Sequence, residues 1–276
     1  MPSGLATYYD RLGRWNRVAR AIGYGGGSTA LTVHRALADP AHGGHTSFTR
    51  LHDLLVEALP PLGAPRVLDA GCGLGGTMLA LARALDATCV GITLSRSQAD
   101  TANLAASRAG LAGRVRAEVG NYDAPPPGPF DLVVAIESLA HSADPARSMR
   151  ALAGVLAPGG LIAIVDDMPE AAAEGTADLA SFKQGWACPV LWSGRQYLEA
   201  CAREGLIVER QQDLTPQSRP RPRWRIWSLM RLNRMVRRLP VRALRQVMDS
   251  HFGGLALERL TRAGQVRYRL LVVRKP

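Results

Sequence analysis

The chain carries the stretch Val67-Leu68-Asp69-Ala70-Gly71-Cys72-Gly73-Leu74-Gly75-Gly76, in which an apolar strand ends at an acid and a cluster of glycines follows. Glycine lets the backbone turn sharply and approach a ligand where a Cβ would collide. Residues 77–82 favour a helix, so the amides of the loop lie at a helix N-terminus, where they can meet a carboxylate or a phosphate. This order of strand, glycine loop and helix predicts a nucleotide-binding pocket.

Residues 71–76 also satisfy G-x-G-x-x-G, a pattern that dinucleotide-dependent dehydrogenases share. Two features argue against a redox dinucleotide. Asp69 directly precedes the glycines, and the next predicted strand ends at Thr93, where a nicotinamide enzyme usually has an acid for the ribose. Together with residues 91–98, Gly-Ile-Thr-Leu-Ser-Arg-Ser-Gln, the stretch resembles the class I S-adenosylmethionine-dependent methyltransferases. It is most similar to the small-molecule branch that contains the sterol and γ-tocopherol methyltransferases and the cyclopropane synthases.

The resemblance continues along residues 5–215. Gly120-Asn121-Tyr122-Asp123 has the place of the family's adenine-contacting loop, residues 130–141 match its fourth strand and following helix, and Asp213-Leu214-Thr215 matches its D-x-T. The cofactor that the resemblance implies is S-adenosylmethionine. The cofactor-binding residues that it implies are Asp69, Gly71, Cys72 and Gly73 at the methionine part, Thr93 and Gln98 at the ribose, and Asn121 and Tyr122 at the adenine.

Two of these assignments have alternatives. Family members usually carry an acid at the position of Asn121, but an amide oxygen can still accept a hydrogen bond from the adenine amino group. Thr93 could instead cap a helix, with Gln98 as a solvated helix residue.

The order of predicted elements indicates the fold. Strands near 66–70, 87–92, 114–119, 130–136 and 160–166 alternate with helices near 75–85, 96–109 and 145–156, and a helix at 193–204 and strands at 205–213 and 265–273 follow. Such alternation predicts an α/β fold with a Rossmann-like doubly wound sheet, mostly parallel with an antiparallel last strand. We expect an N-terminal helical lid over residues 1–60, with a helix at 5–21. The cofactor-binding core is expected to comprise 61–166, 193–215 and 257–276, and helical substrate-cap insertions are expected at 167–192 and 216–256.

Candidate catalytic residues follow the fourth strand. Glu137 and His141 are four positions apart at the start of a predicted helix, which would place both side chains on one face. The carboxylate could take a proton from the substrate or stabilise the sulfonium. Alternatively, Glu137 complements the helix N-terminus and His141 fills a polar niche. Methyl transfer from a sulfonium needs no metal, so we expect no metal ligands, although whether a divalent ion assists a diphosphate stays open.

Substrate-binding candidates lie outside the core motifs. Tyr9 and Tyr24 could cover the cofactor, because family members close the site with an N-terminal aromatic helix, and Trp186 could line an apolar pocket. Packing in the protein core is the alternative for these aromatic residues. Arg223 and Arg231 are candidates for binding an anionic group of the substrate.

The formal charge of +11 is concentrated in one segment. Ten of the 34 basic residues lie between Asp213 and Asp249, an interval without acids, which leaves 24 basic against 23 acidic residues elsewhere. From Leu229 the apolar residues recur at helical spacing with arginines opposite, so the segment predicts a basic amphipathic helix. Three interpretations stay open: a solvated cap helix, a surface that docks on an anionic membrane with help from Trp224 and Trp227, and an anion clamp.

The resemblance implies a small-molecule S-adenosylmethionine-dependent methyltransferase, of a branch that resembles enzymes that methylate alkenes. An apolar aromatic cap beside concentrated arginines suits a lipid tail with an anionic head, so C-methylation of an isoprenoid in natural product biosynthesis is favoured. A prenyl diphosphate is a candidate acceptor, and cyclisation is one outcome. The alternatives are O- or N-methylation of a phenolic or amine natural product and, more distantly, RNA methylation. The four cysteines show no C-x-x-C spacing and no signal-like apolar run is present, so we expect a cytoplasmic protein. We expect a lipophilic, anionic substrate as partner rather than nucleic acid, with peripheral membrane contact and homo-oligomers left open.

Overall fold

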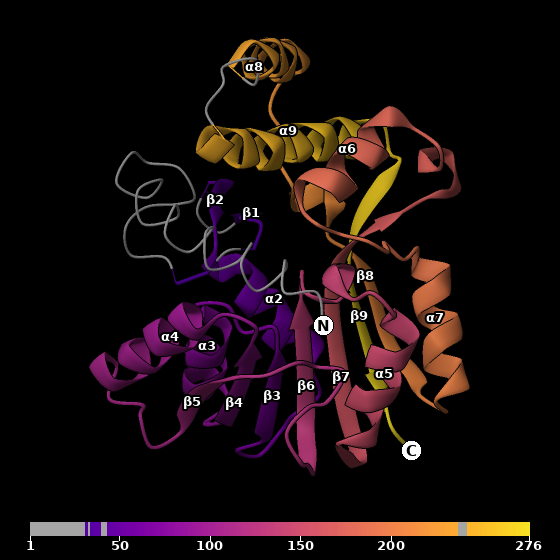
Figure 1. Cartoon of the computed structure of the whole chain (residues 1–276). Helices are drawn as coiled ribbons and strands as arrows, with labels where there is room; N and C mark the ends of the chain where they lie inside the picture. Colours follow the sequence, from indigo (N-terminus) through magenta and orange to yellow (C-terminus); the bar gives the residue numbers. More distant parts are fainter. Residues whose placement is uncertain (1–30, 33, 40–42, 237–241) are drawn as a thin grey trace.

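The computed structural model describes residues 31–32, 34–39, 43–236 and 242–276. A seven-stranded sheet lies at the centre of these residues, with strand order β5-β4-β3-β6-β7-β9-β8 (Figure 1). The strands are β3 (Arg66–Ala70), β4 (Thr88–Thr93), β5 (Val115–Val119), β6 (Phe130–Ile136), β7 (Leu156–Pro169), β8 (Ile207–Asp213) and β9 (Val266–Arg274). Strands β3 to β7 pair in parallel, whereas β9 runs antiparallel to both β7 and β8. The predicted doubly wound sheet with an antiparallel last strand is confirmed.

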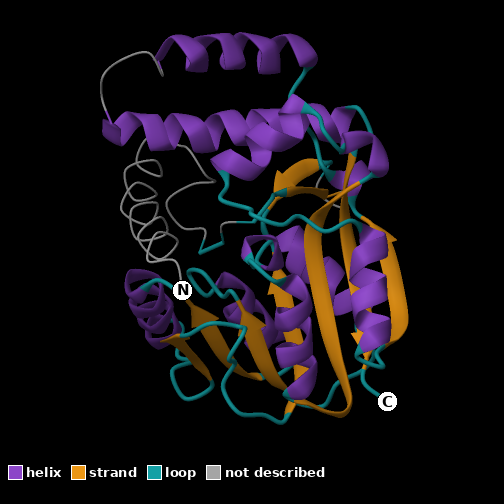
Figure 2. Cartoon of the chain, turned by 45° about the vertical axis from the view of Figure 1, so that its right-hand side comes forward, coloured by secondary structure: helices purple, strands orange, loops and turns teal. Residues whose placement is uncertain are grey.

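Apolar residues on both faces of the strands explain the layered arrangement. Continuous apolar runs such as Leu132–Ile136 suit parallel strands that are covered on both sides. One core joins the sheet to α2 (Thr49–Ala58), α3 (Gly76–Ala84) and α4 (Arg96–Arg108). The other core joins it to α5 (Pro145–Gly154) and α7 (Gly194–Arg203). The sheet is therefore buried between two helical layers, as Figure 2 shows.

The strand order fixes where a ligand can bind. From β3 the chain moves outward through β4 to β5 and then returns to β6 on the opposite side of β3. In open α/β sheets, ligands bind beyond the carboxyl ends of the strands where the order reverses in this way. The end of β3 and the end of β6 are thus the expected walls of the site.

A helical cap covers this end of the sheet. It consists of α6 (Ala177–Gly185), α8 (Arg223–Val236) and α9 (Arg242–Arg262), and α9 lies between α8 and the sheet (Figures 1 and 2). A short hairpin of β1 (Leu37–Asp39) and β2 (His45–Ser47) precedes α2. None of the helices in the described residues is long and apolar enough to cross a bilayer.

Several predicted boundaries differ from the structure. Strand β7 continues to Pro169, because residues 161–169 all pair with β9. Asp167–Pro169 therefore belong to the sheet rather than to the cap insertion predicted at 167–192. Helix α9 runs through the predicted boundary between 256 and 257. The helix predicted at 5–21 lies outside the described residues, and the described part of the predicted lid holds the hairpin and α2.

Candidate active site at the ends of the central strands

The glycine loop after β3 is fixed from two sides. The amides of Gly71 and Cys72 donate to the carbonyl oxygen of Ile92 at 3.1 and 3.0 Å, and the amide of Gly76 donates to Leu31 O at 3.1 Å. Gly71 has φ 113°, and a Cβ there would collide with the side chain of Ser138. The position therefore accepts only glycine, as the sequence predicts.

Asp69 and Ser138 leave buried polar atoms without partners. Among the described residues, neither Asp69 Oδ2 nor Ser138 Oγ has a hydrogen-bond partner. Burial raises the pKa of Asp69 to about 7. Unpartnered buried oxygens next to a glycine loop suit a polar, positively charged ligand that would supply the missing contacts. The cationic methionine part of S-adenosylmethionine fits this requirement.

Thr93 and Gln98 are brought together at the end of β4. Both are buried, and Thr93 Oγ1 donates to Gln98 Oε1 at 2.7 Å. The N-cap of α4 is Ser95, whose Oγ accepts from the amide of Gln98 at 3.3 Å. The alternative of Thr93 as the helix cap and Gln98 as a solvated residue is therefore wrong, and their role at the ribose stays a prediction.

The loop predicted to contact adenine reaches the same region. The hydroxyl of Tyr122 donates to Ser138 O at 3.2 Å, and Asn121 Oδ1 accepts from the amide of Asp123 at 3.2 Å. Ser138 thus contacts Tyr122 and also lies against Gly71. The loops after β3, β5 and β6 converge at this one residue.

Glu137 is held in an unusual conformation at the end of β6. Its φ is 48°, and its Oε1 accepts hydrogen bonds from the Tyr268 hydroxyl at 2.8 Å and from the backbone amide of Arg35 at 2.9 Å. The Arg35 guanidinium lies 4.7 Å from the centre of the Tyr268 ring. A non-glycine residue at positive φ costs about 1–3 kcal/mol, so the surrounding contacts must impose this geometry.

Two further acids, Asp166 and Asp167, extend the cluster from the end of β7. Asp167 binds the Arg35 guanidinium through both carboxylate oxygens, at 2.7 and 2.9 Å. Burial raises its pKa to about 6, although Arg35 opposes the shift. Asp166 accepts from the Tyr197 hydroxyl at 3.0 Å, and burial together with the charges of Asp167 and Glu137 raises its pKa to about 8.

Sequence reasoning did not single out Arg35, Asp166, Asp167 or Tyr268. The two acids had a usable signal, because they directly follow the apolar run Leu161–Val165 at the carboxyl end of a parallel strand. The sequence held no such signal for Arg35 and Tyr268, since each contacts Glu137 across more than 100 positions of the chain.

His141 does not share a helix face with Glu137. Only a single 3-10 turn, Leu139–His141, follows β6, and α5 begins later, at the Asp144 cap and Pro145. The prediction of one helix carrying both residues is therefore wrong, since Glu137 has a left-handed backbone. His141 Nδ1 lies 3.3 Å from Ala187 O and 3.9 Å from Cys188 Sγ. Burial lowers the pKa of His141, which favours a neutral imidazole.

The D-x-T motif positions Tyr268. Asp213 Oδ1 accepts from the amide of Thr215 at 2.8 Å, and Thr215 Oγ1 accepts from the amide of Tyr268 at 2.9 Å. The turn after β8 therefore fixes the residue whose hydroxyl holds Glu137.

Three of the predicted substrate residues, Trp186, Arg223 and Arg231, lie on the cap helices. Tyr9 and Tyr24 lie outside the described residues. Trp186 packs between α6 and α9, where its indole lies 5.9 Å from the Phe182 ring and donates to Ser250 O at 3.0 Å. Arg223 and Arg231 are exposed on α8, beyond α9 as seen from the sheet. The structure does not gather Trp186, Arg223 and Arg231 around Glu137, and the substrate roles of all five residues stay predictions.

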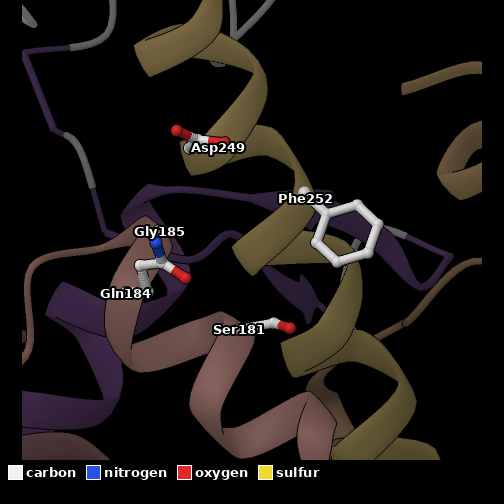
Figure 3. A pocket seen from close by; sticks show the side chains of 5 residues that line it. All are labelled: Ser181, Gln184, Gly185, Asp249 and Phe252. Carbon is white, nitrogen blue, oxygen red and sulfur yellow. The ribbon is translucent and has the colours of Figure 1, made fainter. Parts of the chain in front are cut away.

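The contact between α6 and α9 leaves little free space. Figure 3 shows a pocket there, lined by Ser181, Gln184, Gly185, Asp249 and Phe252. Its volume is about 20 Å³, close to that of a single water molecule. It cannot hold a nucleoside, so the strand ends remain the candidate site.

Comparison with known proteins identifies the family. Residues 68–164 match the family model described as "Methyltransferase domain". The chain is 32% identical over 209 residues to ajmaline N-methyltransferase of Rauvolfia serpentina, an alignment that covers 67% of this chain and 69% of the relative. The chain belongs to the S-adenosylmethionine-dependent methyltransferases. The resemblance stated from the motifs is confirmed, and S-adenosylmethionine is the cofactor of this methyltransferase.

Other relatives of this methyltransferase differ in the acceptor that their names state. It is 34% identical over 176 residues to 27-O-demethylrifamycin SV methyltransferase of Amycolatopsis mediterranei, which covers 62% of this chain and 65% of the relative. A geranyl diphosphate C-methyltransferase structure from Streptomyces coelicolor A3(2) matches with a TM-score of 0.74 and 20% identity, covering 100% of this chain and 98% of that chain. At this identity the structural match shows a shared fold.

Proposed function

We propose that this methyltransferase transfers the methyl group to a carbon atom of an isoprenoid, with prenyl diphosphates as the acceptor class. The observation that carries the proposal is the Glu137 carboxylate, which two hydrogen bonds fix at the switch point of the sheet. The fold shared with a geranyl diphosphate C-methyltransferase over the whole chain supports it.

A fixed carboxylate suits alkene methylation because of the charge that develops. Bound S-adenosylmethionine supplies a methyl group on a positively charged sulfur. An alkene carbon that gains a methyl cation equivalent becomes part of a carbocation, which must lose a proton from a neighbouring carbon or be captured by another double bond. A base of fixed position directs that loss.

The contacts of Glu137 indicate which oxygen would act. Both hydrogen bonds reach Oε1, and among the described residues none reaches Oε2. Oε2 is thus the oxygen that would receive the proton, while Tyr268 and Arg35 hold the carboxyl group in place. Asp167 does not compete for this role, since Arg35 neutralises it.

O- or N-methylation is the second candidate, favoured by the names of the two sequence relatives above. His141 would be the base in that case. If its Nδ1–H donates to Ala187 O, then Nε2 carries the lone pair. A neutral imidazole is the form that can accept a proton from a phenol or an ammonium group.

A labelled substrate screen tests the proposal. The purified protein is incubated with deuteromethyl-labelled S-adenosylmethionine and separate panels of prenyl diphosphates, phenols and amines, and products are scored by mass. We expect prenyl diphosphates to gain one labelled methyl group. Gain by phenols or amines alone would favour the second candidate and overturn the first.

A further inference from the structure

Helix α8 exposes an apolar face that no packing in the described structure explains. Of the eight large hydrophobic side chains that are exposed in the described residues, four lie on this helix: Trp224 (71% exposed), Trp227 (62%), Leu232 (56%) and Met235 (60%). Single exposed apolar residues are common, but a group of them on one helix indicates an interaction surface.

The opposite face of α8 is buried against α9. Ile226 and Met230 are buried against Leu255 of α9, and Asn233 Nδ2 donates to Met248 O at 2.8 Å. The apolar spacing in the sequence grouped Leu229, Leu232, Met235 and Val236 on one face of this helix. In the structure Leu232 and Met235 are exposed, and the buried positions of α8 are 226, 230 and 233.

The exposed face is also strongly basic. Residues 214–248 contain no acid. Elsewhere, surface arginines find carboxylates, as Arg150 does with Glu204. Within the described part of the chain, no ion pair is formed by the four arginines of α8, which are Arg223, Arg225, Arg231 and Arg234. Their charge is therefore available to an external anion.

We propose that α8 docks this methyltransferase on an anionic lipid surface. Tryptophan rings favour the boundary between lipid tails and headgroups, and arginines beside them bind lipid phosphates. The helix is the outermost element of the cap, so it forms a ridge that can enter a bilayer surface (Figures 1 and 2).

A pocket beside α8 also combines an indole ring with arginine side chains. It has a volume of about 340 Å³ and is lined by Trp227 together with Arg223, Arg259 and Arg262. Arg259 is partly neutralised by Asp178, at 3.1 Å. The Arg262 guanidinium donates to the carbonyl oxygens of Arg221 and Pro220 at 2.6 and 2.8 Å. Arg223 therefore gives an anionic headgroup its main place next to the indole ring.

Vesicle binding tests the proposal. The full-length protein is sedimented with vesicles of phosphatidylcholine alone and with vesicles that also contain phosphatidylglycerol. We expect binding to the anionic vesicles at least roughly ten-fold stronger, and weaker as salt rises. Quenching of tryptophan emission by brominated lipid should accompany it in the unaltered protein. Equal binding to both vesicles, or none, would overturn the proposal.

Variants assign the binding to α8. Trp224→Ser/Trp227→Ser should abolish the quenching. Arg225→Gln/Arg231→Gln should weaken binding roughly 25-fold, since each arginine near an anionic surface contributes roughly five-fold. The matched control, Leu104→Ser/Arg108→Gln, removes an exposed leucine and an exposed arginine from α4 and should bind like the unaltered protein.

Other occupants of the face give different results. Concentration-dependent dimers that the tryptophan variant loses, without vesicle binding, would make α8 an interface between copies of the chain. Salt-sensitive retention of RNA without vesicle binding would make it a nucleic-acid surface. Either result overturns lipid docking. Unchanged circular dichroism melting and unchanged binding of S-adenosylhomocysteine show that each variant is folded.

Discussion

At the scale of single residues, long-range hydrogen bonds shape the candidate site. Glu137 is set by Tyr268 and Arg35, which lie 131 and 102 positions away in the chain. A local pattern could indicate Glu137, because it follows an apolar strand, but not the partners that determine its conformation. The same holds for Asp167, whose charge depends on Arg35.

Replacing Glu137 tests its role as the base. Glu137→Gln keeps the side-chain length and an oxygen that can accept from Tyr268, but it cannot take a proton. We expect kcat to fall at least roughly 100-fold. Calorimetric affinity for S-adenosylhomocysteine should stay within a few-fold. Tyr268→Phe removes one hydrogen bond to Oε1 and should give a smaller loss of kcat. Undiminished turnover by Glu137→Gln would exclude the base role.

At the scale of elements, the regular parts of the fold were predictable and the irregular parts were not. The apolar runs and the glycines between them predicted the first and last residues of β3, α3 and β4 closely. The predicted helix after β6 is absent because Glu137 has positive φ, and nothing in the local sequence signals that strain. The amphipathic pattern of α8 was visible in the sequence, but apolar spacing alone did not define its buried face, because arginines surround the helix.

The glycine loop should tolerate no side chain at Gly71. Gly71→Ala places a Cβ against Ser138 at a backbone angle that only glycine adopts readily. We expect the free energy of unfolding in urea to fall by about 2 kcal/mol or more, and the affinity for S-adenosylhomocysteine to fall with it.

Two companion variants separate the causes. Gly113→Ala is the matched control, because a Cβ there meets nothing within 4 Å, and it should change neither quantity measurably. Gly71→Ala/Ser138→Gly removes the colliding Cβ and should recover part of the stability. Equal stability of Gly71→Ala and Gly113→Ala would contradict a close approach of the two loops at Gly71.

At the scale of the whole molecule, the sheet class and the antiparallel last strand followed from the order of elements. The sequence did not reveal how the segment around His34 joins the core. His34 Nε2 lies 3.1 Å from His52 Nε2, and the hydroxyl of Thr77 lies 3.3 Å from the same atom. This buried cluster links the segment before β1 to α2 and α3.

The cluster predicts an acid-sensitive contribution to stability. Burial, and next the charge of His34, lowers the pKa of His52 from its ordinary value of 6.5 to about 4. The folded protein thus keeps His52 neutral, so its contribution is complete above pH 6.5 and is lost as the pH falls toward 4. The loss amounts to about 3 kcal/mol.

Comparing two variants isolates this effect from the buried carboxyl groups, which titrate in the opposite sense. The stability advantage of the unaltered protein over His52→Gln, from urea unfolding at each pH, should shrink as the pH falls from 6.5 to about 4. His45→Gln, which removes a histidine at an exposed position on β2, is the matched control. A constant advantage of the unaltered protein over His52→Gln would show that His52 is not held neutral by the fold.

The most direct test of the proposed reaction is the bonding of the transferred methyl group. The protein is incubated with S-adenosylmethionine carrying a carbon-13 methyl group and the prenyl diphosphate that gains mass in the screen, and the product is examined by nuclear magnetic resonance. A methyl carbon coupled to another carbon of the isoprenoid chain is the predicted result. A methyl carbon bonded to oxygen or nitrogen, or no product from any prenyl diphosphate, would contradict the proposed function.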